Sequence, residues 1–142
     1  YDAVVAWDVL EHLNDPSEFL IKVNSVMKLN GIFCFSTLDI NNWFPKLMGK
    51  HWPWLMEMHL FYYKTDTTEQ LLNEAGIKIL ATEKYIHYVS IHYLVGKIIA
   101  ILPGWLEKPL NIARSAMPQK IMIPISFGDI KLYICEKEEV VY

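Results

Sequence analysis

The sequence is short of cysteine and has no strong excess of either charge. Its two cysteines, Cys34 and Cys135, each lie in an apolar segment typical of a strand. Isolated thiols of this kind favour buried, reduced side chains over a zinc site. The net charge is −3, and no basic run or Arg-rich helix occurs among the 142 residues. We therefore expect a cytoplasmic protein that does not bind nucleic acid.

The sequence also lacks an initiator methionine and a signal-peptide pattern. Its first residues, Tyr1 and Asp2, lead directly into an apolar run, so we expect a fragment that opens in the middle of a strand. The composition is 53% hydrophobic and 13% aromatic against 20% charged. These proportions indicate a folded globular domain and not a disordered chain.

The first forty residues predict a strand, a helix and a second strand. Residues 2–7 (DAVVAW) form a continuous apolar run, which is typical of a parallel strand covered on both faces. Residues 15–18 (DPSE) supply an N-cap, a first-turn proline and an acidic residue, and the apolar spacing then extends the helix to about Lys28. Residues 32–37 (IFCFST) follow as a buried strand. The short connections predict parallel strands joined by a right-handed crossover.

The remaining periodic segments predict one more helix and two more strands. Residues 67–76 read as a capped helix that ends at a glycine, and residues 77–85 read as a strand. Residues 130–136 predict a last strand, antiparallel because no crossover helix precedes it. Residues 38–64 are aromatic without a clear period and predict a lid or pocket wall. Together these elements predict an α/β fold with a doubly wound sheet of parallel strands and one antiparallel strand near the edge.

An apolar insertion separates the last two predicted strands, at residues 86–126. Between Ile86 and Leu106 only Lys97 carries a fixed charge, and Pro103-Gly104 ends an apolar run that is too short to cross a bilayer comfortably. The insertion has a net charge of +3, which leaves −6 for the rest of the chain. We expect a hydrophobic helix that packs over the acceptor pocket or a partner subunit, and the alternative is peripheral contact of residues 86–106 with an anionic membrane.

The segment DAVVAWDVLEHLNDPSEFLIKVNSVMKLNGIFCFST resembles class I S-adenosylmethionine-dependent methyltransferases of the type 11/12 and ubiquinone-biosynthesis O-methyltransferase kind. In that family a strand ending in an acidic-x-x-Glu-His pattern leads into an Asp-Pro-capped helix and then a strand ending Ser-Thr. The stretches INNWFPKLMGKHWPWL and MHLFYYKTDTTEQLLNEAGIKI are similar to the family's next segments. Met58, Phe61 and Lys64 depart from the residues common there. The resemblance covers residues 1 to about 85.

The resemblance implies that the sequence is the C-terminal half of a Rossmann-like sheet, beginning at strand four in the family's order of three, two, one, four, five, seven, six. The glycine-rich cofactor loop and the ribose-binding acidic residue would then lie upstream of Tyr1. The end of strand four would face the cofactor S-adenosylmethionine, because ligands bind at the carboxyl ends of such strands. The candidate cofactor contacts are Ala6, Trp7, Asp8 and Leu10.

Two histidines are candidates for chemistry. Asp8, Glu11 and His12 are spaced to share one face of a helical turn. We expect no metal there, although these three are the candidates for binding a divalent cation, as the resemblance also implies for some relatives. His12 is alternatively a general base, or it and Glu11 only orient the helix through hydrogen bonds. His59, in the loop expected to wall the acceptor site, is the second candidate base.

The aromatic connection supplies candidates for an acceptor pocket, with core packing as the alternative. These are His51, Trp52, Trp54 and Tyr62. We expect methyl transfer to an oxygen of a small, lipid-linked or sugar acceptor. The alternative is a non-catalytic methyltransferase-like fragment or domain whose apolar insertion docks to a membrane or a partner.

Overall fold

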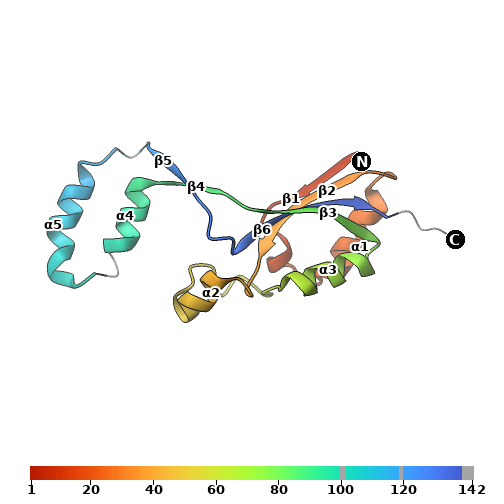
Figure 1. The fold of residues 1–142 in the computed structure, drawn as a ribbon, viewed down its shortest axis with the longest axis horizontal. Helices are drawn as coiled ribbons and strands as arrows, with labels where there is room; N and C mark the ends of the chain where they lie inside the picture. Colours follow the sequence, from red (N-terminus) through yellow and green to blue (C-terminus); the bar gives the residue numbers. More distant parts are fainter. Residues whose placement is uncertain (100–101, 119, 139–142) are drawn as a thin grey trace. The chain divides into compact units, whose positions relative to one another are not determined.

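The computed structural model describes residues 1–99, 102–118 and 120–138, and the chain forms two compact units. The first unit contains Tyr1–Tyr85 and the described residues from Phe127 onward, and the second is Ile86–Ser126. Figure 1 shows the elements of both units along the chain.

The first unit is built on a four-stranded sheet in the order β1-β2-β6-β3 (Figure 1). Its strands are β1 (Ala3–Ala6), β2 (Ile32–Leu38), β3 (Ile77–Lys84) and β6 (Ile130–Lys137). β1 pairs with β2 in parallel, and β6 pairs antiparallel with both β2 and β3. The predicted antiparallel strand is therefore confirmed, and it lies one position in from the edge.

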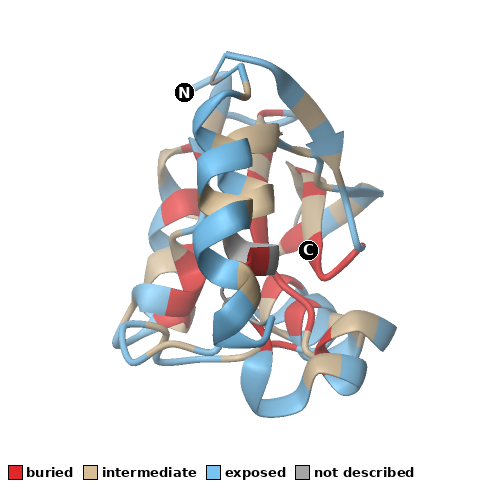
Figure 2. Cartoon of the chain, turned by 90° about the vertical axis from the view of Figure 1, so that its left-hand side faces the viewer, coloured by how far each residue is buried: buried red, intermediate tan, exposed pale blue. Residues whose placement is uncertain are grey.

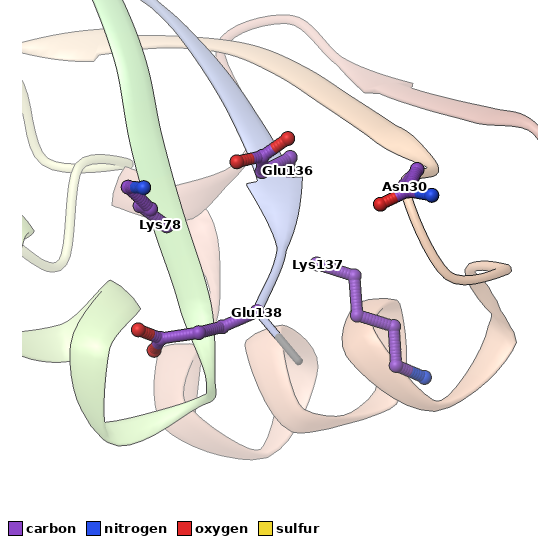
Figure 3. A pocket seen from close by; sticks show the side chains of 5 residues that line it. All are labelled: Asn30, Lys78, Glu136, Lys137 and Glu138. Atoms are coloured by element: carbon purple, nitrogen blue, oxygen red, sulfur yellow. The ribbon is translucent and has the colours of Figure 1, made fainter. Parts of the chain in front are cut away.

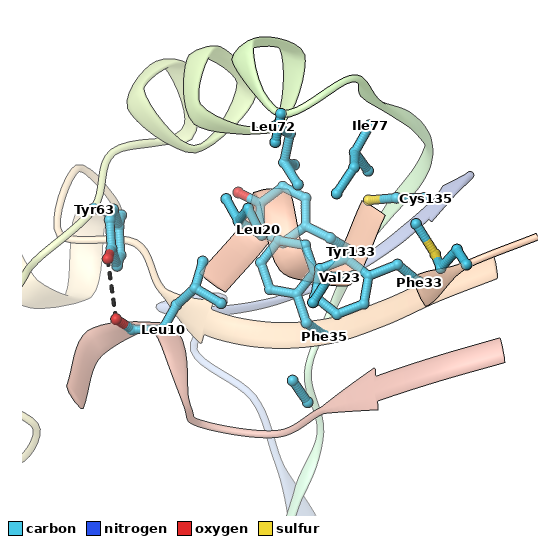
Figure 4. Packing of buried hydrophobic residues seen from close by; sticks show 13 residues of the cluster. Leu10, Leu20, Val23, Phe33, Phe35, Tyr63, Leu72, Ile77, Tyr133 and Cys135 are labelled. Atoms are coloured by element: carbon cyan, nitrogen blue, oxygen red, sulfur yellow. Dashed lines mark hydrogen bonds between the residues drawn. The ribbon is translucent and has the colours of Figure 1, made fainter. Parts of the chain in front are cut away.

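Two helices cover one face of this sheet, α1 (Pro16–Val26) and α3 (Thr65–Glu74). Their apolar side chains meet the rings of Phe33, Phe35 and Tyr133 in the main core (Figure 4). Phe35 stacks on both of the other rings, with centroids 4.8 and 4.9 Å apart. Val5 on the other face is 64% exposed. The prediction that the first strand is covered on both faces is therefore wrong for the described chain, because both helices lie on the same side.

The helix ends differ slightly from the prediction. The Asp15 carboxylate accepts a hydrogen bond from the Glu18 N–H at 2.9 Å, so the predicted N-cap of α1 is confirmed. This helix ends at Val26, because Met27 is already extended. α3 begins at Thr65, two residues before the prediction, and has no side-chain cap.

The segment between β2 and α3 contains two short helices that the sequence pattern did not predict. These are α2 (Trp43–Met48), which Asn42 caps, and the 3-10 turn η2 (Gly49–His51). Leu38, Trp52 and Ile130 form a second buried cluster beneath them. A further 3-10 turn, η1 (Leu10–His12), follows β1 after residues 7–9.

The second unit is a pair of helices that lies, in sequence, between two paired antiparallel strands. It contains β4 (His87–Ser90), α4 (Ile91–Ile99), α5 (Gly104–Ser115) and β5 (Met122–Ile125), and β4 pairs antiparallel with β5. α5 has no buried residue, as its pale blue and tan colouring shows (Figure 2). Among the described residues, no helix has the length and apolar character that crossing a membrane requires.

Candidate active site

The chain leaves β1 through a turn that β2 holds in place. Asp8 adopts a left-handed backbone conformation (φ 51°), which short polar residues tolerate better than others. The buried Ser36 hydroxyl donates to Asp8 Oδ1 at 2.9 Å and accepts from the Asp8 N–H at 3.0 Å. The Ser-Thr end of β2 therefore anchors the acidic residue that follows β1.

Glu11 is the buried acid of the site. Its side chain is 1% exposed, and the Thr37 hydroxyl donates to Oε2 at 3.0 Å. Burial raises the pKa of Glu11, and hydrogen bonds from its own backbone and from Thr37 oppose that rise. Its carbonyl oxygen accepts from the N–H groups of Leu60 and Phe61 at 2.7 and 3.2 Å. The loop that carries His59 is therefore fastened to η1.

A tyrosine adds a second connection between this loop and η1. The Tyr63 hydroxyl donates to the Leu10 carbonyl at 3.1 Å, as the dashed line in Figure 4 shows. Burial, together with the charge of Glu11, raises the pKa of Tyr63. This hydroxyl thus remains a neutral donor at neutral pH.

His12 and His59 lie beside each other, with ring centroids 4.6 Å apart in an edge-to-face arrangement. His12 Nδ1 lies 2.8 Å from the Met58 carbonyl oxygen, and His59 Nδ1 lies 2.7 Å from the Trp54 carbonyl oxygen. A carbonyl oxygen only accepts hydrogen bonds, so Nδ1 is the donor in both contacts. In each neutral imidazole, Nε2 is then the atom that can accept a proton or bind a cation.

These two histidines and Glu11 also form a group that could hold a metal ion. One ligand atom from each of the three side chains lies within 4.8 Å of the others. Asp8 is not part of this group, which shares only Glu11 and His12 with the candidate set of Asp8, Glu11 and His12. The helical turn begins only at Leu10, and the Asp8 carboxylate is held by Ser36. Two imidazoles and a carboxylate suit a first-row transition metal, and carbonyl acceptors on Nδ1 are typical of histidine ligands.

The candidate cofactor contacts divide into exposed and buried residues. Trp7 is 47% exposed and Asp8 is exposed, so both can meet a ligand at the carboxyl end of β1. Ala6 and Leu10 belong to the main core, and Leu10 is completely buried. Leu10 can therefore contribute only through its backbone in this conformation.

The candidate acceptor contacts lie in different surroundings. Trp52 is 3% exposed, and its indole N–H donates to Asp129 Oδ2 at 2.8 Å, so its ring would have to leave the core to touch an acceptor. The Tyr62 hydroxyl accepts from the Met56 N–H at 3.0 Å. Trp54 is half-buried and His51 is exposed. An acceptor role for these residues stays a prediction.

A charged network that the sequence pattern did not reveal supports this loop. Lys131 at the start of β6 forms an ion pair with Asp39 at 2.8 Å, and both bond to the Thr65 hydroxyl. Asp39 is 5% exposed. The network joins the ends of β2, β6 and α3, so it fixes the segment that contains α2.

A pocket at the other end of the sheet is lined by five polar or charged residues (Figure 3): Asn30, Lys78, Glu136, Lys137 and Glu138. It lies at the amino ends of β2 and β3, opposite the end where ligands of open α/β sheets bind. Lys137 Nζ there donates to the Asn24 and Met27 carbonyl oxygens at 2.9 and 3.3 Å. This lysine therefore caps the C-terminal end of α1.

Comparison with known families identifies the first unit. The sequence profile of the family described as "Methyltransferase domain" matches residues 1–82, more than half of the chain. The chain belongs to this methyltransferase family. Comparison with curated protein sequences gives no match.

Solved structures share the fold of this methyltransferase chain at low sequence identity. The SAM-dependent methyltransferase of Thermotoga maritima is 13% identical with a TM-score of 0.55, over 96% of this chain and 56% of that protein. The [4+2]-cyclase SpnF is 18% identical with a TM-score of 0.52, over 97% and 50%. StiE O-MT is 11% identical with a TM-score of 0.51, over 99% and 45%. The chain thus spans about half the length of these proteins.

Proposed function

We propose that this chain is part of an S-adenosylmethionine-dependent enzyme that methylates an oxygen of a small, lipid-linked or sugar acceptor. The observation that supports this most strongly is the pair of imidazoles at the end of β1. Residues 47 positions apart in sequence meet there, and each donates its Nδ1 proton to a backbone carbonyl. Two Nε2 atoms are left to accept protons. Such an arrangement suits removal of a proton from a hydroxyl.

The residues at the end of β1 fit the cofactor. Trp7 offers a partly exposed aromatic ring and Asp8 an exposed carboxylate, and both groups attract a sulfonium cation. The bound cofactor supplies a methyl group that the positive sulfur activates for displacement. Asp8 can hold its position during binding because Ser36 fixes it from β2.

The histidines would act on the acceptor. The Nε2 atom of His12 or His59 accepts the hydroxyl proton as the acceptor oxygen forms its bond to the methyl carbon. His12 is the more accessible of the two, since it is exposed and His59 is half-buried. Alignment of the acceptor oxygen with the methyl carbon would further accelerate the transfer. The loop that is hydrogen-bonded to Glu11 and Leu10 is suited to hold the acceptor in that alignment.

The same cluster supports a second role for the histidines, as ligands of a divalent cation. The ligand atoms of Glu11, His12 and His59 within 4.8 Å of one another favour it. A cation there would polarise the acceptor hydroxyl. Chelation distinguishes the two roles. If EDTA abolishes activity and a divalent cation restores it, the histidines act as cation ligands. If EDTA leaves activity unchanged, they act as general bases without a cation.

The test of the methyltransferase proposal is binding and transfer by the full-length protein that contains this chain. We expect calorimetry to detect S-adenosylhomocysteine binding, and methyl-labelled S-adenosylmethionine to label a small-molecule or lipid extract. An ether product keeps its label in hot alkali, whereas a methyl ester loses it as methanol. Binding without alkali-stable label would contradict oxygen methylation of a hydroxyl, and no binding would contradict the enzyme.

Replacement of either histidine should separate chemistry from cofactor binding. In His12→Asn and His59→Asn the amide can still donate to the carbonyl that Nδ1 now contacts, but the substituted position no longer carries a base. We expect the variant that removes the acting base to lose about 100-fold or more of the transfer rate, and both variants to keep an unchanged dissociation constant for S-adenosylhomocysteine. His92→Asn, in the second unit, is the matched control. Equal rates in all three variants would contradict the assignment.

A further inference from the structure

The outer face of α5 is an apolar surface with a single charge. Trp105 is 76% exposed and Ile112 is 73% exposed. They are seven residues apart, so they lie two turns apart on one side of the helix. Lys108 and Pro109, both exposed, lie between them on this side. The name "α5 outer face" below means these four residues.

The other side of α5 packs within the second unit. The Arg114 side chain donates from Nε to the His92 carbonyl at 2.8 Å. A Cβ on Gly96 would clash with the Arg114 guanidinium, so α4 and α5 are closely packed there. Leu106 and Leu110 are partly buried. The exposed Trp105 and Ile112 are therefore not needed to hold the helical pair together.

The charge of the second unit favours one kind of partner. Residues 86–126 have a net charge of +3, against −6 for the rest of the chain. Glu107, the single acid in this unit, is two residues from Trp105 and so points away from the α5 outer face. A short helix that presents tryptophan, an aliphatic residue and lysine, with no acid on that side, is typical of contact with an anionic lipid surface.

We propose that the α5 outer face docks this protein on the surface of an anionic membrane. Trp105 and Ile112 would enter the boundary between head groups and acyl chains, and Lys108 would contact lipid phosphates. Helix α5 would lie in the plane of the membrane and would not cross it. The contact belongs to α5, at residues 104–115, and extends beyond the 86–106 segment that the sequence alone suggested.

The proposal is independent of methyl transfer, so its test uses no enzymatic readout. The full-length protein is sedimented with vesicles of phosphatidylcholine alone and with vesicles of equal parts phosphatidylcholine and phosphatidylglycerol. We expect binding to the anionic vesicles only, weakened by salt. Trp105→Ser combined with Ile112→Ser should weaken binding by about tenfold or more, and Lys108→Glu should weaken it at low salt.

The matched control removes two exposed hydrophobic side chains elsewhere. Ile21 and Leu29 are 58% and 62% exposed in the first unit, and Ile21→Ser with Leu29→Ser should leave vesicle binding unchanged. Equal binding by the α5 double variant and the wild type would overturn the proposal. Failure of the wild type to bind anionic vesicles would overturn it too, and loss of self-association in the α5 variant would then identify a second copy as the partner.

Discussion

At the scale of single residues, Glu11 links stability to pH. Its folded-state pKa lies above the usual 4.5 because the carboxyl group is buried. The folded protein therefore keeps a proton that the unfolded chain releases, and stability falls as pH rises from about 4.5 through the raised value. Glu11→Gln has no proton to lose, so its stability relative to wild type should increase from mildly acidic to neutral pH. Urea denaturation across this range measures the difference, and parallel curves for both proteins would contradict it.

The cysteines show what residue type alone predicts. Cys135 is completely buried, Cys34 is partly buried, and both are free thiols. Cys135 in β6 lies opposite Phe33 in β2, so the two side chains lie on the same face of the sheet. Cys34 follows Phe33 in β2 and therefore points to the opposite face. Burial raises the pKa of Cys135 to about 12, and the neighbouring Cys34 adds to this rise. The prediction that both cysteines lie in apolar strands is confirmed, because it depends only on local sequence.

At the scale of elements, the Lys131–Asp39 ion pair should stabilise the joint between β2, β6 and α3. Lys131→Met leaves the Asp39 carboxylate buried without its cation, so we expect a loss of about 2 kcal/mol in the free energy of unfolding. The Lys28–Asp2 pair is similarly short, at 2.7 Å, but both side chains are mostly exposed. Lys28→Met is therefore the matched control, with an expected change near zero. Similar losses in chemical denaturation of both variants would show that burial is not the cause.

Elements with local signals were predictable, and elements that depend on distant contacts were not. The start of α1 follows from Asp15 and Pro16, which are adjacent in sequence. α2 has six residues with Pro45 inside it, too few for an apolar period to stand out. The meeting of His12 with His59 requires the loop to be tied back by Glu11 and Tyr63. No spacing along the chain indicates that contact, so the sequence named His12 and His59 only as separate candidates.

At the scale of the whole molecule, the chain leaves the four-stranded sheet to form the second unit and returns to the sheet at a neighbouring position. Lys84 at the end of β3 pairs with Lys131 near the start of β6, and the Tyr85 N–H donates to the Ile130 carbonyl at 3.1 Å. The two ends of the insertion are therefore already close. Such an arrangement tolerates removal of the segment between them.

Replacement of Ile86–Ser126 by a short Gly-Ser linker should therefore preserve the first unit. We expect the full-length protein with this deletion to keep slow hydrogen exchange at the amides of β2 and β6, because their pairing is unchanged. The same variant should no longer sediment with anionic vesicles. Fast exchange throughout β2 and β6 would show that the second unit is needed for folding.

The position of β6 also determines when the protein can fold during its synthesis. This strand comes last among the strands of the sheet, yet it lies between β2 and β3. Until it leaves the ribosome, β3 has no neighbour and the rings of Phe33 and Phe35 lack their contact with Tyr133 and Cys135. The edge of β2 therefore waits for its β6 partner until roughly a hundred further residues have been synthesised. We expect this interval to be when the chain most needs a chaperone.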